Sequence, residues 1–365
     1  MIYSLSVLNP SLQTTKIIFE FISCIWTSQY YGTGEFELVV PYTEENLSAL
    51  SVGNYVVKNN TNEIAVIEKV RYEYSPNEGG KLIASGRMAI SLLDRRLMYS
   101  FSPSTHHPNV FTYCAQGGNM EDYARQTVKL QAIEPYAGGS ARVISNLLLG
   151  TDHGYTETAN KRISTYLNLY SALTSFLATK GMAHRITFDA AATKLRYEVY
   201  KGTDRSSSMV FSRNLENLLS FAYETDSTEW KNLIYIAGDG EGLTRFVTST
   251  TMNGYVTGTE RREVLYEASS SREDGVTDAS YNSLIINEAK QECKTLNKTK
   301  NIEAEIDLIN SGYEFGTDYN VGDIILIRDI VDFKPRITTV IESQSADGYT
   351  IDVEFNEDAP EEEEE

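Results

Sequence analysis

The chain offers few residue combinations that could catalyse a reaction. Its four histidines are His106, His107, His153 and His184. None stands in the HExxH spacing or in another spacing typical of a metal site, and the pair before Pro108 indicates a polar loop. Ser175 and the serines within 206–212 lack the GxSxG turn that exposes a nucleophile. We therefore expect no nucleophile with a partnering base, and no enzyme.

Carboxylates are the one catalytic group in abundance, with 51 acidic residues among 365. A glycosidase that cuts cell wall needs one protonated and one ionised carboxyl across the scissile bond. Acidic residues are so frequent here that such pairs can be drawn anywhere along the chain. Their presence does not discriminate, and a glycosidase is the weaker of two alternatives that stay open.

The second alternative is a receptor- or carbohydrate-binding module. The chain has 24 tyrosines, and pairs such as Tyr30 with Tyr31 or Tyr72 with Tyr74 could stack on sugars. The alternation of polar and aromatic residues around Tyr72 also suits one face of a sheet, and we favour that interpretation. Saturable shifts on addition of wall glycans would identify a binder.

Three alternating glycines form the most distinctive local motif: Gly238, Gly240 and Gly242. Glycines can expose amide groups to a phosphate, but no helix start and no Lys-Ser/Thr pair follows this loop. We favour a tight loop in which the backbone takes positive φ or approaches another chain closely. Contacts between domains or subunits are expected at these glycines and at three arginines, Arg245, Arg261 and Arg262.

The cysteines Cys24, Cys114 and Cys293 are odd in number and far apart. This spacing argues against a disulfide framework and against a zinc site, so we expect small buried apolar residues. We expect no cofactor and no metal.

The net charge of −19 argues against tight binding of nucleic acid, which needs Lys and Arg to neutralise phosphates. An acidic channel would instead repel DNA and let it slide through. We expect the acidic end, 357–365, to be a disordered and self-repelling tail.

A chain of 365 residues exceeds one hydrophobic core, so two or three domains are expected. No apolar run approaches the roughly 20 residues of a membrane span, and no signal peptide is recognisable. Synthesis and folding in a cytoplasm follow from this interpretation.

Two distant stretches repeat one plan: an alternating strand, a Val-Gly-Asn or Val-Gly-Asp turn, an extended run and a closing strand. They comprise 35–40, 52–54, 55–57 and 64–68 in the first copy, and 303–308, 321–323, 324–327 and 337–342 in the second. We interpret them as a duplicated β-domain with structural turns at Gly53, Gly322 and Asp323. Replacing Gly322 with Val is expected to disrupt its turn and to impair folding or assembly.

The intervening segment 115–205 has a different composition and predicts a small α/β insertion. Helical spacing is found over 119–129, over 140–149 and, most clearly, over 161–180, where Gly181 ends the run. Strands are expected over 183–188 and 194–201. In the following region, 206–300, the sequence predicts a buried strand at 233–238 and a helix over 282–297.

A set of short motifs, each weak alone, resembles the Siphovirus ReqiPepy6 Gp37-like family of phage tail proteins in order and spacing. They are GEFEL at 34–38 with Pro41, LLDRR at 92–96, GDGEG at 238–242 with Arg245, REVL at 262–265, YNVGDI at 319–324, Arg336-Ile337, and GYTI at 348–351 with Phe355. The resemblance covers residues 1 to 356.

The resemblance implies a structural tail hub at the tail tip or baseplate of a phage or prophage virion, synthesised in the bacterial cytoplasm. Such hubs are homotrimers with two tube-like β-barrel domains and additional α/β domains. We therefore expect a β-rich α+β fold divided into 1–114, 115–205, 206–356 and the tail. Three chains with two copies each would give six similar positions in a ring.

The partners that this role implies are a distal tail or tail tube protein on one side and a tip or fibre protein on the other. Tape-measure protein and DNA would pass through without specific binding. Larger tail-associated proteins continue into a fibre or lytic domain, whereas this sequence ends at residue 365. Host binding and wall cutting are therefore expected in another protein.

Overall fold

The computed structural model of the protein describes residues 2, 4–59, 61–77, 79–98, 111–113, 118–135, 139–158, 162–164, 167–252, 257–272 and 275–357. Two compact units are present. Unit 1 comprises Met1–Leu218 and Ile306–Glu365, and unit 2 comprises Leu219–Glu305. Both ends of the chain belong to unit 1, and the expected division into 1–114, 115–205 and 206–356 remains a prediction.

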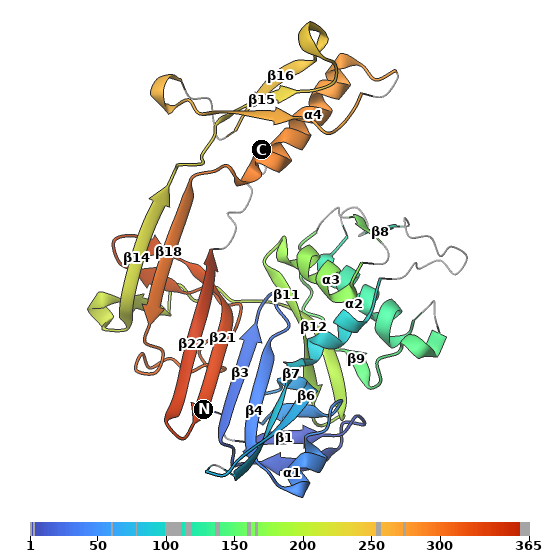
Figure 1. The fold of residues 1–365 in the computed structure, drawn as a ribbon, viewed down its shortest axis with the longest axis vertical. Coiled ribbons are helices and arrows are strands. Elements are labelled where there is room, and N and C mark those ends of the chain that lie inside the picture. The colour runs from blue at the N-terminus through green and yellow to red at the C-terminus, as the bar shows by residue number, and fades with distance from the viewer. Residues whose placement is uncertain are drawn as a thin grey trace. The chain divides into compact units, whose positions relative to one another are not determined.

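A nine-stranded sheet forms the framework of unit 1, in the order β2-β1-β5-β6-β7-β4-β3-β21-β22 (Figure 1). Its strands are β1 (Leu5–Leu8), β2 (Thr14–Ile18), β3 (Ser23–Gln29), β4 (Glu35–Pro41), β5 (Tyr55–Lys58), β6 (Ile64–Ser75), β7 (Gly79–Met88), β21 (Pro335–Ser345) and β22 (Gly348–Glu357). All neighbouring strands in this sheet are antiparallel.

The period-two pattern explains why these segments are strands. In β4, Phe36 and Leu38 are buried while Glu35 and Glu37 are exposed. The buried side chains join those of β3, including Trp26, in one apolar core. The short helix α1 (Glu44–Ala49) follows β4 and begins at Thr43, whose hydroxyl accepts the Asn46 N–H (3.0 Å).

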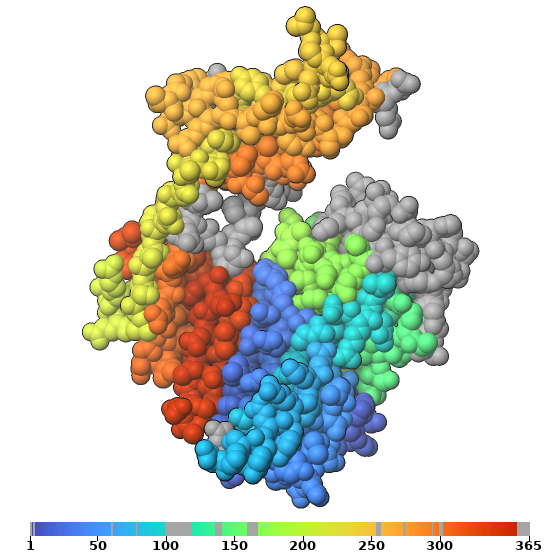
Figure 2. Space-filling model, in the orientation of Figure 1, coloured from blue at the N-terminus to red at the C-terminus, as the bar shows by residue number. Residues whose placement is uncertain are grey.

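The C-terminal hairpin of β21 and β22 belongs to the sheet that the N-terminal strands build. Strand β21 pairs with β3 from Thr339↔Gln29 to Ser345↔Ser23. Figure 2 shows the N-terminal and C-terminal strands side by side on the surface. The closing hairpin of the second copy is therefore continuous with the sheet of the first copy, whereas β18 and β19 of the second copy lie in separate small sheets.

The segment between the copies folds as a helical and β layer against the first copy. Its elements are β8 (Phe111–Tyr113), α2 (Met120–Val128), β9 (Leu147–Leu149), β10 (Arg162–Ser164), α3 (Leu169–Ala178), β11 (Met182–Asp189) and β12 (Lys194–Lys201). Asn119 and Asn168 cap α2 and α3 with their side-chain oxygens. The apolar faces of both helices pack on β11 and β12 in one core that continues into the first copy.

The rest of unit 1 contains a small sheet of β13 (Val210–Ser212), β19 (Leu326–Arg328) and β20 (Asp332–Phe333). Unit 2 has two parts. One is the ribbon of β14 (Leu218–Asp226) and β18 (Thr299–Ile306). The other is the sheet β16-β15-β17, formed by β15 (Leu233–Ala237), β16 (Val247–Thr251) and β17 (Glu263–Glu267), and packed on α4 (Asp278–Glu292).

The structure confirms some of the elements that the sequence predicts and corrects others. The β-rich architecture with some helices is confirmed, and the expected strands of the insertion correspond to β11 and β12. The expected helix over 140–149 is wrong, because Leu147–Leu149 is a strand that pairs in parallel with β12. The long helix over 161–180 is shorter than expected and begins at Leu169. Helix α4 starts and ends earlier than 282–297.

Several expectations concern residues outside the described part of the chain. His106, His107, Cys114 and the tail from 358 onwards lie there. Cys24 and Cys293 are buried with free thiols. Among the described helices, none has the length and apolar character that a membrane crossing needs.

Candidate functional site

The predicted turn at Gly53 joins β5 to the strand that follows it by two backbone hydrogen bonds. The Gly53 N–H donates to the Ile67 carbonyl (2.9 Å), and the Ile67 N–H donates to the Asn54 carbonyl (2.8 Å). Gly53 has φ +92°. A bulge follows immediately, between Ile67 and Lys69.

The turn at Gly322 repeats this arrangement in the second copy. The Gly322 N–H donates to the Ile337 carbonyl (2.8 Å), and the Ile337 N–H donates to the Asp323 carbonyl (2.9 Å). Gly322 has φ +100°, and a bulge again follows, between Ile337 and Thr339. The two copies thus share a turn, its bonds, the bulge and the long hairpin beyond it.

Gly322 also lies where three distant segments of unit 1 meet. A Cβ on Gly322 would stand 2.3 Å from Cε2 of Tyr30, and a Cβ on Gly202 would stand 1.6 Å from the Gly322 carbonyl oxygen. The Tyr30 hydroxyl donates to the Gly181 carbonyl (2.8 Å). This junction requires glycine for space as well as for backbone conformation.

Asp323 fixes the same junction with its carboxylate. It accepts the Thr203 N–H (2.7 Å), the Asn320 N–H (3.0 Å) and the Arg205 guanidinium (2.8 Å), and is 3% exposed. The carboxylate ties the end of the insertion to the second copy. The sequence identified the turn residue but not these partners.

A buried ion cluster links the two copies beside the β3–β21 pairing. Lys58 is fully buried and pairs with Glu63 (2.7 Å) and with Glu342. Its ammonium also lies 5.5 Å from the Trp26 ring centroid. Burial lowers the pKa of Lys58 but the two carboxylates outweigh it, so the net shift is upward and the amine stays charged. The Tyr349 hydroxyl donates to Glu342 (2.9 Å).

No sequence signal distinguishes Lys58 or Glu342 from ordinary strand residues. Each follows a short apolar run, and only the pairing of β21 with β3 brings them together. A cluster of this kind is costly to break from one side, because the remaining charges lose their partners.

Three strand edges of the large sheet have no strand partner among the described residues. Two are the outer edges of β2 and β22, the first and last strands of the sheet. The third is the stretch 69–74 of β6, because β5 pairs only with the beginning of β6, up to Val66. Unpaired edges present rows of N–H and C=O groups that can accept a further strand.

One face of this sheet carries exposed charged side chains. The carboxylates are Glu35 and Glu37 of β4 and Asp352 and Glu354 of β22, and the cations are Lys69 and Arg71 of β6. Register places Glu35 beside Thr27, Thr27 beside Ile341, and Ile341 beside Asp352, in one row across four strands. The opposite face carries the core residues Phe36 and Trp26.

The glycine loop of unit 2 joins β15 to β16. Gly240 has φ +96° and Gly242 has φ +54°. A Cβ on Gly238 would stand 2.8 Å from the Tyr281 hydroxyl oxygen of α4. Tight turning and close packing on the helix therefore account for all three glycines.

The arginines that follow also find partners within unit 2. Arg245 donates to the Gly238 carbonyl (3.1 Å), and Arg261 donates to Glu263 (2.5 Å). The Arg262 guanidinium lies 5.4 Å from the Trp230 ring centroid. Partners in a second subunit remain a prediction.

The described histidines do not stand in a catalytic arrangement. His184 lies in the core between Thr174 (2.9 Å) and Tyr197 (3.1 Å), and burial lowers its pKa to about 3. His153 is near the buried Glu121 (3.6 Å), whose carboxylate accepts the His153 and Tyr155 backbone N–H groups. No cluster of three or more metal-ligating side chains occurs in the described ranges.

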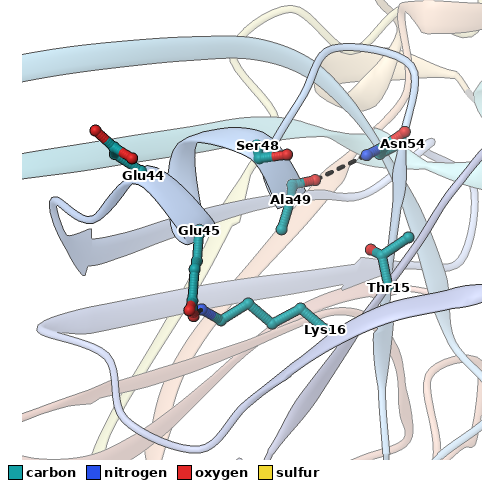
Figure 3. Close-up of a pocket in the computed structure, with 7 residues that line it drawn as sticks. All are labelled: Thr15, Lys16, Glu44, Glu45, Ser48, Ala49 and Asn54. Carbon is teal, nitrogen blue, oxygen red and sulfur yellow. Dashed lines mark hydrogen bonds and ion pairs between the residues drawn. The ribbon is translucent and has the colours of Figure 1, made fainter.

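A surface pocket of about 520 Å³ lies between α1 and β2 (Figure 3). Lys16 and Glu45 form an ion pair there (3.1 Å), and the Asn54 amide donates to the Ala49 carbonyl (2.7 Å). Glu44 also lines the pocket, and the lining residues contain no nucleophile with a base. The pocket suggests no reaction.

The fold is that of phage and prophage tail proteins. It is similar to the 43 kDa tail protein of prophage MuSo2 from Shewanella oneidensis, with a TM-score of 0.56 and 12% identity over 97% of this chain and 98% of that one. A tail protein from Neisseria meningitidis MC58 gives a TM-score of 0.52 and 14% identity over 98% and 97%. No curated protein sequence matches the chain.

The family is shown by the sequence itself. A model of the Siphovirus ReqiPepy6 Gp37-like protein family matches residues 4–355, and the chain belongs to that family. It is a structural protein of a phage or prophage tail.

Proposed function

We propose that the protein is the hub of the tail, a homotrimer that forms a ring between the tail tube and the tip or baseplate. The repeated turn, bulge and hairpin support this role most directly, because two equivalent copies per chain give six equivalent positions in a trimer. Such a ring would adapt a sixfold tube to a threefold tip.

The strand edges support a closed ring. Each chain has an open edge at β22 and another at 69–74 of β6 among its described residues. A closed ring of strands would remove such edges, whereas a free monomer would leave them open to aggregation. Two tube-like barrel domains per chain are part of this proposal.

The charged face of the sheet is the proposed wall of the channel. Glu35, Glu37, Asp352 and Glu354 would face the lumen together with the exposed cations Lys69 and Arg71 of the same face, and the excess of carboxylates would repel DNA phosphates and limit sticking. Tape-measure protein and DNA would pass along this wall without specific binding.

The insertion 115–205 would lie at the periphery of the ring. The loop of Gly238, Gly240 and Gly242 and the arginines Arg245, Arg261 and Arg262 are proposed contacts with neighbouring domains or subunits. A distal tail or tube protein would dock on one end and a tip or fibre protein on the other.

Imaging of the purified chain tests this function. Class averages should show a ring with a central channel, threefold symmetry and six similar densities around it. Particles without a channel, or closed assemblies with two or four chains, would contradict the hub.

A further inference from the structure

The ribbon of β14 and β18 corresponds to β3 and β4 of the first copy. In the first copy, Ile25 lies opposite Glu37, and the Ile22 N–H donates to the Val39 carbonyl (2.8 Å). In the second copy, the Ser220 hydroxyl donates to the Glu305 carboxylate (3.4 Å). The Asp307 N–H donates to the Asn217 carbonyl (3.0 Å), so the residues that correspond to 22 and 39 are again hydrogen-bonded, with donor and acceptor exchanged.

This correspondence assigns each residue of β14 a counterpart in β3. Ser220 corresponds to Ile25, so Phe221 corresponds to Trp26 and Leu219 to Cys24. The turn of 30–34 between β3 and β4 is replaced in the second copy by the sheet and helix of unit 2, which lie between β14 and β18.

The ribbon has an apolar stripe that is incompletely covered. Leu219 is 58% exposed, and Phe221 and Tyr223 on the same face are half-buried. A two-stranded ribbon is marginally stable alone and needs a further strand or layer.

The open stretch of β6 has the matching character. Tyr72 is 53% exposed and Tyr74 is 67% exposed, and the Tyr42 ring packs against Tyr72 at 5.0 Å between centroids. Because Ile67 corresponds to Ile337 and the bulges coincide, Tyr72 corresponds to Glu342 and Tyr74 to Gln344.

The chain itself shows how these two surfaces meet. Glu342 of β21 lies opposite Trp26 of β3, and Gln344 lies opposite Cys24. We propose that β14 of a second copy of this chain pairs antiparallel with 69–74 of β6, with Tyr72 opposite Phe221 and Tyr74 opposite Leu219. The proposal rests on the proposed trimeric ring and names the strands that close it.

The proposed register also matches charges on the other face of the two strands. Lys69 falls opposite Glu224, and Arg71 falls opposite Ala222 with Glu224 diagonal to it. All four side chains are exposed in the single chain. Opposite charges and aromatic pairs across strands both stabilise antiparallel pairing.

The two kinds of junction differ in chemistry, which would keep them from exchanging. Within the chain, the junction contains the buried ions Lys58 and Glu342. Between chains, the same positions would be occupied by aromatic and aliphatic side chains. Placing Tyr72 in the ionic junction would leave Lys58 with one carboxylate fewer, a costly mismatch.

Disulfide crosslinking tests the register directly. The full chain would carry Arg71→Cys and Ala222→Cys, with Cys114→Ser, since Cys24 and Cys293 are buried. Opposed Cβ atoms lie within the reach of a disulfide, about 4–5 Å apart. The matched control carries its cysteine at Asp226 instead of Ala222. Asp226 lies on the same face of β14, about 13 Å further along the strand.

We expect the first pair to give covalent dimers and trimers on a non-reducing gel and the control to stay at single-chain mass. A native trimer in which the first pair fails to crosslink would overturn the strand pairing and leave the ring intact. A chain that is monomeric at every concentration and does not crosslink would overturn the ring itself.

A second variant set separates the aromatic contact from folding. Tyr72→Ser with Tyr74→Ser should raise the concentration for half-assembly by about tenfold or more, at an unchanged unfolding midpoint when both proteins are compared as dilute single chains. Ile330→Ser, which removes an exposed apolar side chain between β19 and β20, is the control and should leave assembly unchanged. Equal assembly of all three proteins would contradict the proposed contact.

Discussion

Replacement of Gly322 by alanine, compared with the same replacement at Gly53, separates two reasons for a glycine in equivalent turns. Both residues have positive φ, +100° and +92°. A Cβ on Gly53 meets no atom within 4 Å, whereas a Cβ on Gly322 stands 2.3 Å from the Tyr30 ring. Gly53→Ala therefore reports backbone strain alone.

The magnitudes follow from these geometries. Strain at positive φ costs about 1–3 kcal/mol at either position. At Gly322, overpacking adds about 1–3 kcal/mol, because Tyr30 is 1% exposed and its hydroxyl is held by the Gly181 carbonyl (2.8 Å) and the Gly202 N–H (3.0 Å). We expect Gly322→Ala to lose about 2–6 kcal/mol of unfolding free energy, and Gly322→Val to lose more.

Urea unfolding followed by tyrosine fluorescence and circular dichroism measures the difference. With a urea slope of about 3 kcal/mol per molar, the added clash lowers the midpoint by about 0.3–1 M below that of Gly53→Ala. Equal midpoints for the two variants would refute the reasoning, because the Tyr30 contact would then not constrain Gly322.

Three further changes have signs that the structure fixes. Lys58→Met should lower the free energy of unfolding, measured in urea, by about 3–5 kcal/mol, since it leaves Glu342 buried without its cation. Adding Glu342→Gln should recover part of this free energy. An unchanged urea midpoint for Lys58→Met would contradict the stabilising role of the ion cluster. Burial lowers the pKa of His184 to about 3, so between pH 6.5 and 3 the unfolded state binds a proton that the folded state does not. The free energy of unfolding therefore falls by about 1.4 kcal/mol per pH unit as the pH drops through this range. His184→Gln should flatten this slope, measured by urea midpoints at several pH values. Hydrogen bonds from Ser270, Ser269 and Tyr266 lower the pKa of Glu288 to about 2. The stability that this carboxylate contributes is therefore present above pH 4.5 and is lost as the pH falls towards 2. Thermal melts should show a smaller loss of stability in acid for Glu288→Gln than for the original chain, and parallel losses would contradict this role of Glu288.

Local patterns in the sequence were sufficient to locate many of the elements. Strand β4 follows from the alternation around Phe36, and the turn at Gly322 follows from a Val-Gly-Asp triplet before an apolar run. The pair β11 and β12 follows from two strand-like runs with a short connection. These features depend on residues close in sequence, so periodicity and turn chemistry decide them.

Features that depend on distant residues were not predictable. The apolar run at Leu147–Leu149 fits a helix or a strand equally, and its parallel pairing with β12 decides the outcome. The start of α3 at Leu169 was available in the sequence, because Asn168 is a capping residue. The pairing of β21 with β3 spans some 300 residues, and it alone brings Lys58 to Glu342.

The candidate contact residues illustrate the same limit. Gly53, Gly322 and Asp323 stand in turns, as the triplets predict. The glycines and arginines of unit 2 were proposed as contacts between domains or subunits, and the described structure gives them partners within that unit. Tyr72 was considered as a sugar-stacking residue or a sheet residue, and the contact proposed for it follows only from comparing the two copies.

The absolute mass of the purified full chain, measured by light scattering over a concentration series, tests the trimeric hub most directly. We predict a species at three times the chain mass of 40.9 kDa that persists on dilution. A chain that stays at 40.9 kDa at every concentration would contradict the ring.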